Sequence, residues 1–227
     1  MAHPFDHQAW DADNSAETDF PKAVFQNSML HGWAFISDSI VAHSETFGWD
    51  LFESASPTGV EICWNLHADA ISSADNERRL LSLMITLVGG VYTGGIVHLQ
   101  RDFDSYCRQK TSSQFCSNIR LGDIKKEETS LVDGNWMKFE QEAYHSMQGR
   151  RFFITECGRF GLGPSFLEDG DICGVVLGCR MRLVIRPTST SGHVKVLGPS
   201  YVDGVMYGEL IIAHVKSTSD LSEITLV

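Results

Sequence analysis

The sequence predicts an α+β protein in which N-terminal helices pack on a C-terminal small antiparallel β-barrel or bent sheet. Two observations carry this prediction. From Phe25 to Phe47 apolar residues recur at steps of three, four or seven, and the stretch from Trp136 to Gln148 also has the spacing typical of helices. From Arg150 on, short apolar runs return every eight to fifteen residues between glycine, proline and serine clusters. Short strands so closely spaced favour an antiparallel barrel or a strongly bent sheet.

Composition divides the chain into three parts. The chain has 227 residues, of which 43% are hydrophobic, which is enough for a sizeable core. Residues 1–19 are acidic and poor in large apolar side chains, so we expect a flexible acidic arm there. We expect residues 20–149 to be mainly helical and residues 150–227 to be β-rich, the two forming one compact unit.

The first predicted helix runs from about Lys22 to Thr46. Asp19 is a suitable N-cap for it, and Pro21 fits near the first turn, where its missing N–H costs nothing. Its apolar residues share one face at helical spacing: Phe25, Met29, Trp33, Ile36, Ile40 and Phe47. A short strand is predicted next, from Val60 to Leu66.

Three more helices are predicted before the β-rich part, at Glu77 to about Val88, His98 to Lys110, and Trp136 to Gln148. The first is apolar nearly all round and should be buried, and Gly149 ends the last. The charged stretch from Ser112 to Asn135 is expected to be a mobile loop or solvated surface. Strands are predicted at Arg151 to Glu156, Ile172 to Leu177, Leu183 to Arg186, Val194 to Leu197 and Leu210 to Val215.

Charge and motifs argue against several classes of protein. The net charge of −11 would repel a nucleic-acid backbone and an anionic membrane, so we expect neither partner. No run of about 18 apolar residues occurs and the start is acidic, which predicts a cytoplasmic protein without a signal peptide. The six cysteines form no C-x-x-C pair, so we expect free thiols. Nucleotide-binding, metal-binding and hydrolase motifs are missing, so no cofactor and no metal are expected.

An ordered series of glycine, arginine and aromatic residues runs through the β-rich part. It reads R-x-F-x-T-x-x-G-x-x-G-L-G-P from Arg151, then G-D at Gly170, a strand that ends at Arg186, and Y-V-x-G-x-M-x-G-E from Tyr201 to Glu209. This series resembles the C-terminal region of fungal heterokaryon-incompatibility (HET) domain proteins. With weaker similarities upstream, the resemblance covers about residues 60 to 215.

Three residues depart from the family pattern. Where the family has a proline before F-V-L-R, a histidine after Y-V and an aspartate before the last G-E, this chain has Arg182, Asp203 and Tyr207. The family's N-terminal HET domain, a TIR-like module credited with triggering cell death, has no counterpart in this sequence, so that activity is not carried over. We expect the three departures to mark a function peculiar to this protein.

The candidate site follows from these departures and from the aromatic residues. Asp203, Tyr207 and Arg182 are the predicted catalytic residues, because a carboxylate near a phenol can act as acid and base and arginine can donate hydrogen bonds. The predicted substrate-binding residues are Tyr201, Glu209, Trp64 and Trp136. The aromatic residues could equally be core.

A structural alternative stands beside the catalytic one. Glu209 and Asp171 could pair with Arg151 or Arg186, or could receive backbone N–H groups in tight turns, because buried charges need partners whatever their function. Further single candidates for catalysis are His98 with Asp102, and His145.

Two functions from different classes follow. The first is a cofactor-independent fungal biosynthetic enzyme that cyclises or isomerises a hydrophobic small molecule, a terpenoid or polyketide intermediate, by a pericyclic reaction such as a Diels–Alder cyclisation. The second is a non-catalytic recognition or regulatory module of heterokaryon-incompatibility signalling. The enzyme predicts a deep apolar pocket of roughly 300–1,000 Å3, whereas the module predicts an exposed apolar patch. Neither the substrate nor the oligomeric state follows from the sequence pattern.

Overall fold

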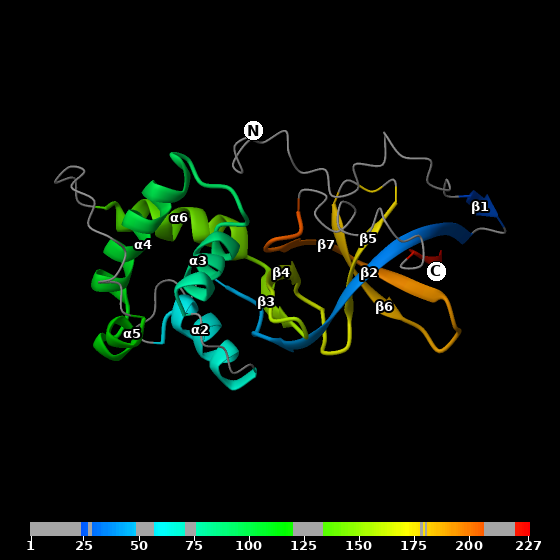
Figure 1. The fold of residues 1–227 in the computed structure, drawn as a ribbon, viewed down its shortest axis with the longest axis horizontal. Helices are drawn as coiled ribbons and strands as arrows, with labels where there is room; N and C mark the ends of the chain where they lie inside the picture. Colours follow the sequence, from blue (N-terminus) through cyan, green and yellow to red (C-terminus); the bar gives the residue numbers. More distant parts are fainter. Residues whose placement is uncertain are drawn as a thin grey trace.

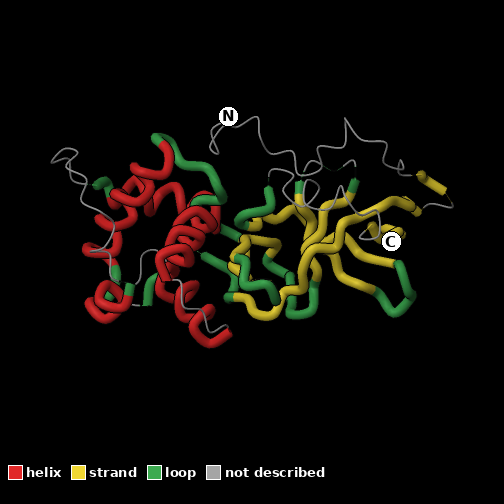
Figure 2. Tube along the Cα trace, viewed as in Figure 1, coloured by secondary structure: helices red, strands yellow, loops and turns green. Residues whose placement is uncertain are grey.

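Helices gather at one end of the molecule and strands at the other (Figures 1 and 2). The structure, a computed structural model, describes residues 24–26, 29–48, 57–70, 76–119, 134–177, 179, 181–206 and 221–227. Within these ranges the chain forms five helices and eight strands. The predicted α+β class is confirmed. The predicted acidic arm, residues 1–19, lies outside the described residues.

The helices occupy the stretch between residues 59 and 147. They are α2 (Gly59–Ala70), α3 (Asn76–Leu87), α4 (Gly95–Lys110), α5 (Ser113–Asn118) and α6 (Trp136–Met147). Three of them, α3, α4 and α6, confirm helices predicted from the sequence. Gly149 follows α6 with a φ of 70°, a left-handed conformation that favours glycine and ends the helix as predicted. α5 lies within the stretch predicted as a loop, whose residues 120–133 are outside the described part.

The start of α2 corrects the strand predicted from Val60 to Leu66. Thr58 and Glu61 form a reciprocal cap, in which the Glu61 N–H donates to Thr58 Oγ1 over 3.3 Å and the Thr58 N–H donates to Glu61 Oε2 over 2.7 Å. This capping box satisfies two backbone donors of the first turn, which would otherwise lack partners inside the helix. The cap therefore outweighs the β-branched and aromatic residues that suggested a strand.

Six strands close into an antiparallel ring in the order β2–β3–β4–β7–β6–β5, with β5 pairing back to β2. β1 pairs with the start of β2, while β8 pairs antiparallel with β2 and parallel with β7. The strands are β1 (Val24–Gln26), β2 (Met29–His43), β3 (Arg150–Thr155), β4 (Phe160–Pro164), β5 (Ile172–Val176), β6 (Arg182–Pro187), β7 (His193–Val202) and β8 (Leu221–Leu226).

The prediction of a helix from Lys22 to Thr46 is wrong, because most of that stretch is β2. This strand pairs with β8, β5 and β3 in turn along its length. Two register shifts, between Ile36 and Asp38 and between Ile40 and Ala42, break its alternation. Each bulge adds one residue and so reverses the face that the following side chains take. The apolar residues therefore fell at spacings that imitate a helix.

The strands predicted after residue 150 are confirmed as β3, β5, β6 and β7, whereas β4 and β8 were not predicted. The strand predicted at Leu210 to Val215 lies outside the described residues. Both β4 and β8 are short, and β4 (FGLGP) contains two glycines and a proline, which are depleted in strands. Its pairing with β3 places Gly161 against Phe153, where a Cβ would lie 2.2 Å from the ring. Glycine is therefore required there by packing.

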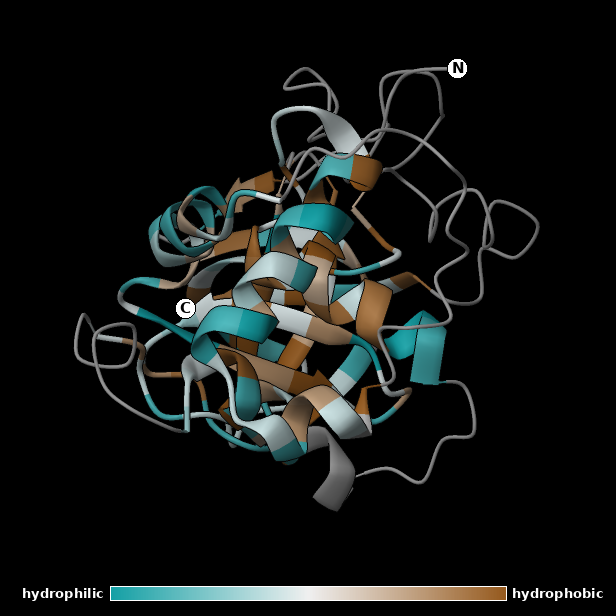
Figure 3. Cartoon of the chain, turned by 90° about the vertical axis from the view of Figure 1, so that its left-hand side faces the viewer, coloured by the Kyte–Doolittle hydropathy of each residue, from teal (hydrophilic) through white to brown (hydrophobic). Residues whose placement is uncertain are grey.

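The two largest apolar cores of the described residues organise the molecule. The larger joins the helices to one face of β3 and β4, through Phe152, Ile154, Phe160 and Leu162. A second core, which includes Phe153 and Val184, is built from the strands of the ring. Seen from the helical end in Figure 3, hydrophobic segments gather in the middle of the molecule. None of the helices in the described ranges is both long and apolar enough to cross a membrane.

Candidate functional site

Asp203, one of the predicted catalytic residues, lies just after β7 and joins the ring to the helices. Its Oδ2 accepts a hydrogen bond from Ser82 Oγ of α3 over 2.6 Å, and its Oδ1 accepts one from the Tyr201 hydroxyl over 3.3 Å. The Asp203 N–H donates to the Phe160 carbonyl over 2.9 Å. Both carboxylate oxygens and the backbone donor are thus used within the fold, which gives Asp203 a structural role at the junction.

Tyr201, a predicted substrate-binding residue, is buried at the same junction. Its side chain is 4% exposed and packs against Gly90, where an added Cβ would lie 2.4 Å from Tyr201 Cε2. Gly90 has a φ of 77°, so both its conformation and the close approach of the ring favour glycine. The ring of Tyr201 is therefore enclosed by the turn after α3, and its hydroxyl is directed to Asp203.

Arg182, the other departure from the family pattern that the structure describes, is fully buried in the ring at 0% exposure. Its Nε donates a hydrogen bond to the Val205 carbonyl over 2.9 Å. It also lies near Cys173, where burial raises the pKa of the thiol to about 12 and the Arg182 charge acts in the opposite direction. Arg182 and Asp203 are held by different partners. Tyr207 and Glu209 lie outside the described residues.

The two predicted tryptophans belong to different parts of the helical end. Trp64 is buried in the larger core, edge-on to Phe115 at 6.2 Å between ring centroids, with the Arg79 guanidinium 5.0 Å from its ring. Trp136 begins α6, and the Lys110 ammonium lies 4.4 Å from its ring. The contacts of Trp64 and Trp136 do not bring them to Asp203.

The structural alternative is confirmed for Asp171 and Arg186. Arg186 Nε and Nη2 donate to Asp171 Oδ1 and Oδ2 over 2.7 and 2.8 Å, a bidentate pair. The Glu168 N–H donates to Asp171 Oδ2 over 2.8 Å. Arg151 instead donates to the Leu167 carbonyl over 2.8 Å. These family-matched charges therefore fix the turn between β4 and β5.

The weaker histidine candidates are also accounted for by local contacts. His98 Nδ1 lies 2.8 Å from the Gly94 carbonyl, one turn earlier on α4. Asp102 is 6% exposed and accepts hydrogen bonds from the Tyr92 hydroxyl over 2.6 Å and from the Asn135 N–H over 2.7 Å. His98 and Asp102 therefore do not form a pair. The ring of His145 packs edge-on to Tyr144 at 6.0 Å.

All six cysteines are free, as predicted. Burial raises the pKa values of Cys63 and Cys107 well above the ordinary thiol value. Cys157 is exposed, but its hydrogen bond to Asp38 and the charge of that carboxylate raise the pKa of its thiol as well. A nucleophilic cysteine needs a lowered pKa, so none of these three thiols is activated. Across the described residues, no group of three or more His, Cys, Asp or Glu side chains is arranged to hold a metal ion.

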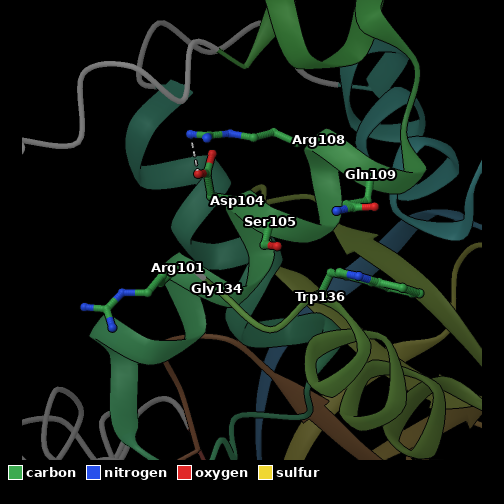
Figure 4. Close-up of a pocket in the computed structure, with 7 residues that line it drawn as sticks. All are labelled: Arg101, Asp104, Ser105, Arg108, Gln109, Gly134 and Trp136. Atoms are coloured by element: carbon green, nitrogen blue, oxygen red, sulfur yellow. Dashed lines mark ion pairs between the residues drawn. The ribbon is translucent and has the colours of Figure 1, made fainter. Parts of the chain in front are cut away.

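A cavity of about 420 Å3 lies between α4 and the start of α6 (Figure 4). Its lining residues are Arg101, Asp104, Ser105, Arg108, Gln109, Gly134 and Trp136. The volume is in the range of ligand sites, but the lining is mostly polar or charged. It is therefore unlike the apolar pocket that the enzyme hypothesis requires. Of these residues the sequence singled out Trp136 alone, although Arg101, Asp104 and Arg108 have the three- and four-residue spacing of one helix face.

Residues 130–220, which contain most of the closed ring and its family-matched turns, match the family model described as the Het-6 beta-barrel domain, so this part of the chain is similar to that domain. The matched range contains β3 to β7, whereas β2, which closes the ring, lies outside it. Over 121 residues the chain is 39% identical to Heterokaryon incompatibility protein 6, OR allele, of Neurospora crassa. That alignment spans 52% of this chain and 17% of the relative. No solved structure matches the chain.

These matches confirm the resemblance to heterokaryon-incompatibility proteins that the glycine and arginine series indicated. They also overturn the first functional hypothesis. The prediction of a biosynthetic cyclase, isomerase or pericyclase is wrong, because the chain is similar to a heterokaryon-incompatibility protein and its residues 130–220 match the Het-6 beta-barrel model. The catalytic roles predicted for Asp203, Tyr207 and Arg182 depended on that hypothesis. Catalysis of any other kind stays a prediction.

Proposed function

We propose that this chain is a non-catalytic recognition or regulatory module of fungal heterokaryon-incompatibility signalling. The observation that carries the proposal is the match of residues 130–220 to the Het-6 beta-barrel domain, together with the Neurospora crassa relative. The alignment spans 17% of that relative. A role in heterokaryon incompatibility, which belongs to the whole relative, is therefore proposed for this chain. A cytoplasmic location, and the lack of nucleic-acid and membrane partners, remain predictions from sequence and charge.

The polar residues of the junction support this proposal. A carboxylate that acts as a general base must lie within hydrogen-bond reach of the proton that it abstracts. Both oxygens of Asp203 instead accept hydrogen bonds from Ser82 and Tyr201, and the Arg182 side chain is fully buried. The bond from Ser82 to Asp203 ties α3 to the ring, which suits a module whose surface must keep one shape.

A surface suited to recognition lies at the end of the sheet opposite the helices, where β1 and the C-terminus lie in Figure 1. Phe25 pairs with Leu30, and Leu30 pairs with Leu226 on the other side, so these residues neighbour one another across three strands. Phe25 is 72% exposed and Leu30 is 36% exposed. With Val24 and Val227, both also exposed, they form what we call the apolar sheet end.

Within the described residues, β1 pairs with β2 alone, so the apolar sheet end coincides with a strand edge. An exposed strand edge offers backbone N–H and C=O groups to an added strand, and exposed apolar side chains next to it add specificity. The contact that we propose is therefore with an extended apolar segment of another incompatibility protein.

The proposal is tested in Neurospora crassa strains that form stable heterokaryons. Expression of the full chain in one partner should reduce growth of the heterokaryon and increase staining by a cell-death dye. Phe25→Ser should restore growth, because it removes the most exposed large apolar side chain of the apolar sheet end. Phe166→Ser is the matched control, since Phe166 is an exposed phenylalanine in the turn after β4. Equal growth with and without the chain would overturn the proposal.

A further inference from the structure

The cavity between α4 and α6 is a built feature of the helical end. Gly134 approaches α4 so closely that an added Cβ would lie 2.1 Å from the Arg101 carbonyl oxygen, and a larger residue would force the two segments apart. The next residue, Asn135, is fixed by its N–H bond of 2.7 Å to the buried Asp102 carboxylate, and its side chain caps α6 through the Lys138 N–H. The wall opposite α4 is therefore held at a fixed distance.

Arg101 is one of the two arginines that line the cavity. In the part of the chain that the structure describes, neither an ion pair nor a hydrogen bond engages its guanidinium, although the side chain is half-buried. Figure 4 shows the Arg101 and Arg108 side chains extending towards the same side of the view, while the Trp136 ring extends the other way. Two arginines against one aspartate leave the lining with a net positive charge, in a chain of net charge −11.

Asp104 is the carboxylate of the cavity lining. Its Oδ2 pairs with Arg108 Nη2 over 2.6 Å, whereas its Oδ1 is buried and has no hydrogen-bond partner among the described residues. Burial is also the main cause that raises the pKa of this carboxyl, against the opposing charge of Arg108. A buried acceptor without a partner costs free energy, so a donor placed beside Oδ1 would be favoured.

The other residues that line the cavity can make further polar contacts, and they offer a ligand little apolar surface. Ser105 and Gln109 add a hydroxyl and a side-chain amide, which both donate and accept hydrogen bonds. The Trp136 ring is held by the Lys110 ammonium, which in turn lies 3.4 Å from Glu140 Oε1. A ligand of this cavity must therefore be small, polar and anionic, and must carry donors of its own.

We propose that this cavity binds a small hydroxylated organic anion, a phosphate ester or a hydroxycarboxylate. Its anionic group pairs with the Arg101 guanidinium, whose planar donors fit phosphate and carboxylate alike. A hydroxyl group of the ligand donates to Asp104 Oδ1, a buried acceptor that has no hydrogen-bond partner among the described residues. The site lies on the helical end, whereas the apolar sheet end lies at the opposite end of the molecule, so this binding is independent of the recognition surface proposed above.

Isothermal titration calorimetry of the full chain with ribose 5-phosphate and with citrate tests the proposal, with ribose and inorganic phosphate as partial probes. We expect one of the two hydroxylated anions to bind at micromolar to low millimolar concentration and ribose not to bind. Arg101→Gln should weaken that binding at least about tenfold, since it removes a charged hydrogen-bond donor. Lys195→Gln, the same loss of charge at an exposed position on β7, should leave it unchanged.

Two further outcomes decide between the parts of the proposal. Asp104→Asn should weaken ribose 5-phosphate or citrate more than inorganic phosphate, because it alters the acceptor for the hydroxyl group. If neither hydroxylated anion binds, or if Arg101→Gln binds as tightly as the unaltered chain, the site is refuted. Inorganic phosphate binding as tightly as ribose 5-phosphate would refute the role of Asp104. Arg101→Gln lies on a half-buried surface position, so its melting temperature should match that of the unaltered chain and separate lost binding from lost folding.

Discussion

Replacing Glu61 by alanine should strongly destabilise the helical end. Glu61 is 3% exposed and receives bonds at both oxygens: from the Thr58 N–H and hydroxyl at Oε2, and from the Ser112 N–H and hydroxyl at Oε1 over 3.0 and 2.6 Å. Ser112 is itself the N-cap of α5. One carboxylate therefore joins the first turns of α2 and α5, and its removal leaves donors of both turns without an acceptor.

The size of the expected loss in stability follows from those donors. A buried donor left without an acceptor costs about 1–3 kcal/mol, and the Thr58 N–H is buried while the Ser112 N–H is partly buried. We therefore expect Glu61→Ala to lower the free energy of unfolding by about 3 kcal/mol, or the melting temperature by about 10 °C for a chain of this size. Glu77→Ala is the matched control, because Glu77 is an exposed glutamate in the first turn of α3 and should cost under about 1 kcal/mol.

The pH dependence gives a second measure of the same contact. Burial alone would raise the pKa of Glu61, but the hydrogen bonds from Ser112 and Thr58 outweigh it, so the pKa lies below its ordinary value of 4.5. A carboxylate whose pKa is lowered by folding stabilises the folded state at any pH above its pKa in the unfolded chain. This stabilisation is lost as the pH falls through its pKa in the folded chain. The difference in melting temperature between the unaltered chain and Glu61→Gln should thus be largest at neutral pH and should become smaller below about pH 4.

Thermal unfolding followed by circular dichroism measures both effects. Two results would refute the reasoning: a loss for Glu61→Ala no larger than that for Glu77→Ala, or a gap for Glu61→Gln that widens as the pH falls. Either would mean that the bonds to Thr58 and Ser112 do not offset the burial of the charge.

Two other substitutions test the junction and the turn after β4. Ser82→Ala removes the 2.6 Å bond to the Asp203 carboxylate and should cost about 1.5–3 kcal/mol in urea unfolding, and an unchanged midpoint would argue against a junction held by Asp203. Arg186→Lys replaces the bidentate pair with Asp171 by a single point charge and should lower the melting temperature by several degrees, while Lys195→Arg, an exposed change on β7, should not. Equal melting temperatures for the two variants would show that the bidentate geometry contributes nothing.

Elements whose pattern lies within one stretch of chain could be predicted from the sequence. Strands whose shape depends on partners far away in the chain could not. α6 was predicted because its apolar spacing and Gly149 lie within one stretch of chain. β2 was not, because its bulges are set by β5 and β3, strands that come much later in the chain. The Thr58 to Glu61 cap was a local signal that was present and overlooked, since T-x-x-E before an apolar run is typical of a helix start.

The candidate site could be predicted in part. Asp203 and Tyr201 were singled out together, and they do share a hydrogen bond. The residue that decides what Asp203 does is Ser82, which lies 121 positions earlier and gives no sign in the sequence of where its hydroxyl points. The unsatisfied Oδ1 of Asp104 is likewise a property of packing, because helical spacing predicts the Asp104 to Arg108 pair but not the burial of one oxygen.

The long strand β2 has a consequence for how the protein is made. His43 pairs with Phe153, so the whole helical end is synthesised between one ring strand and its neighbour, and β8 is added later still. A ribosome adding about 5–20 residues per second needs several seconds or more to cover that interval. During it the helices, whose mutual contacts are local, can form, while the apolar residues of β2 have no other strand of the ring to pair with. Closure of the ring is therefore the late step of folding, and β2 is the segment that a chaperone would have reason to hold.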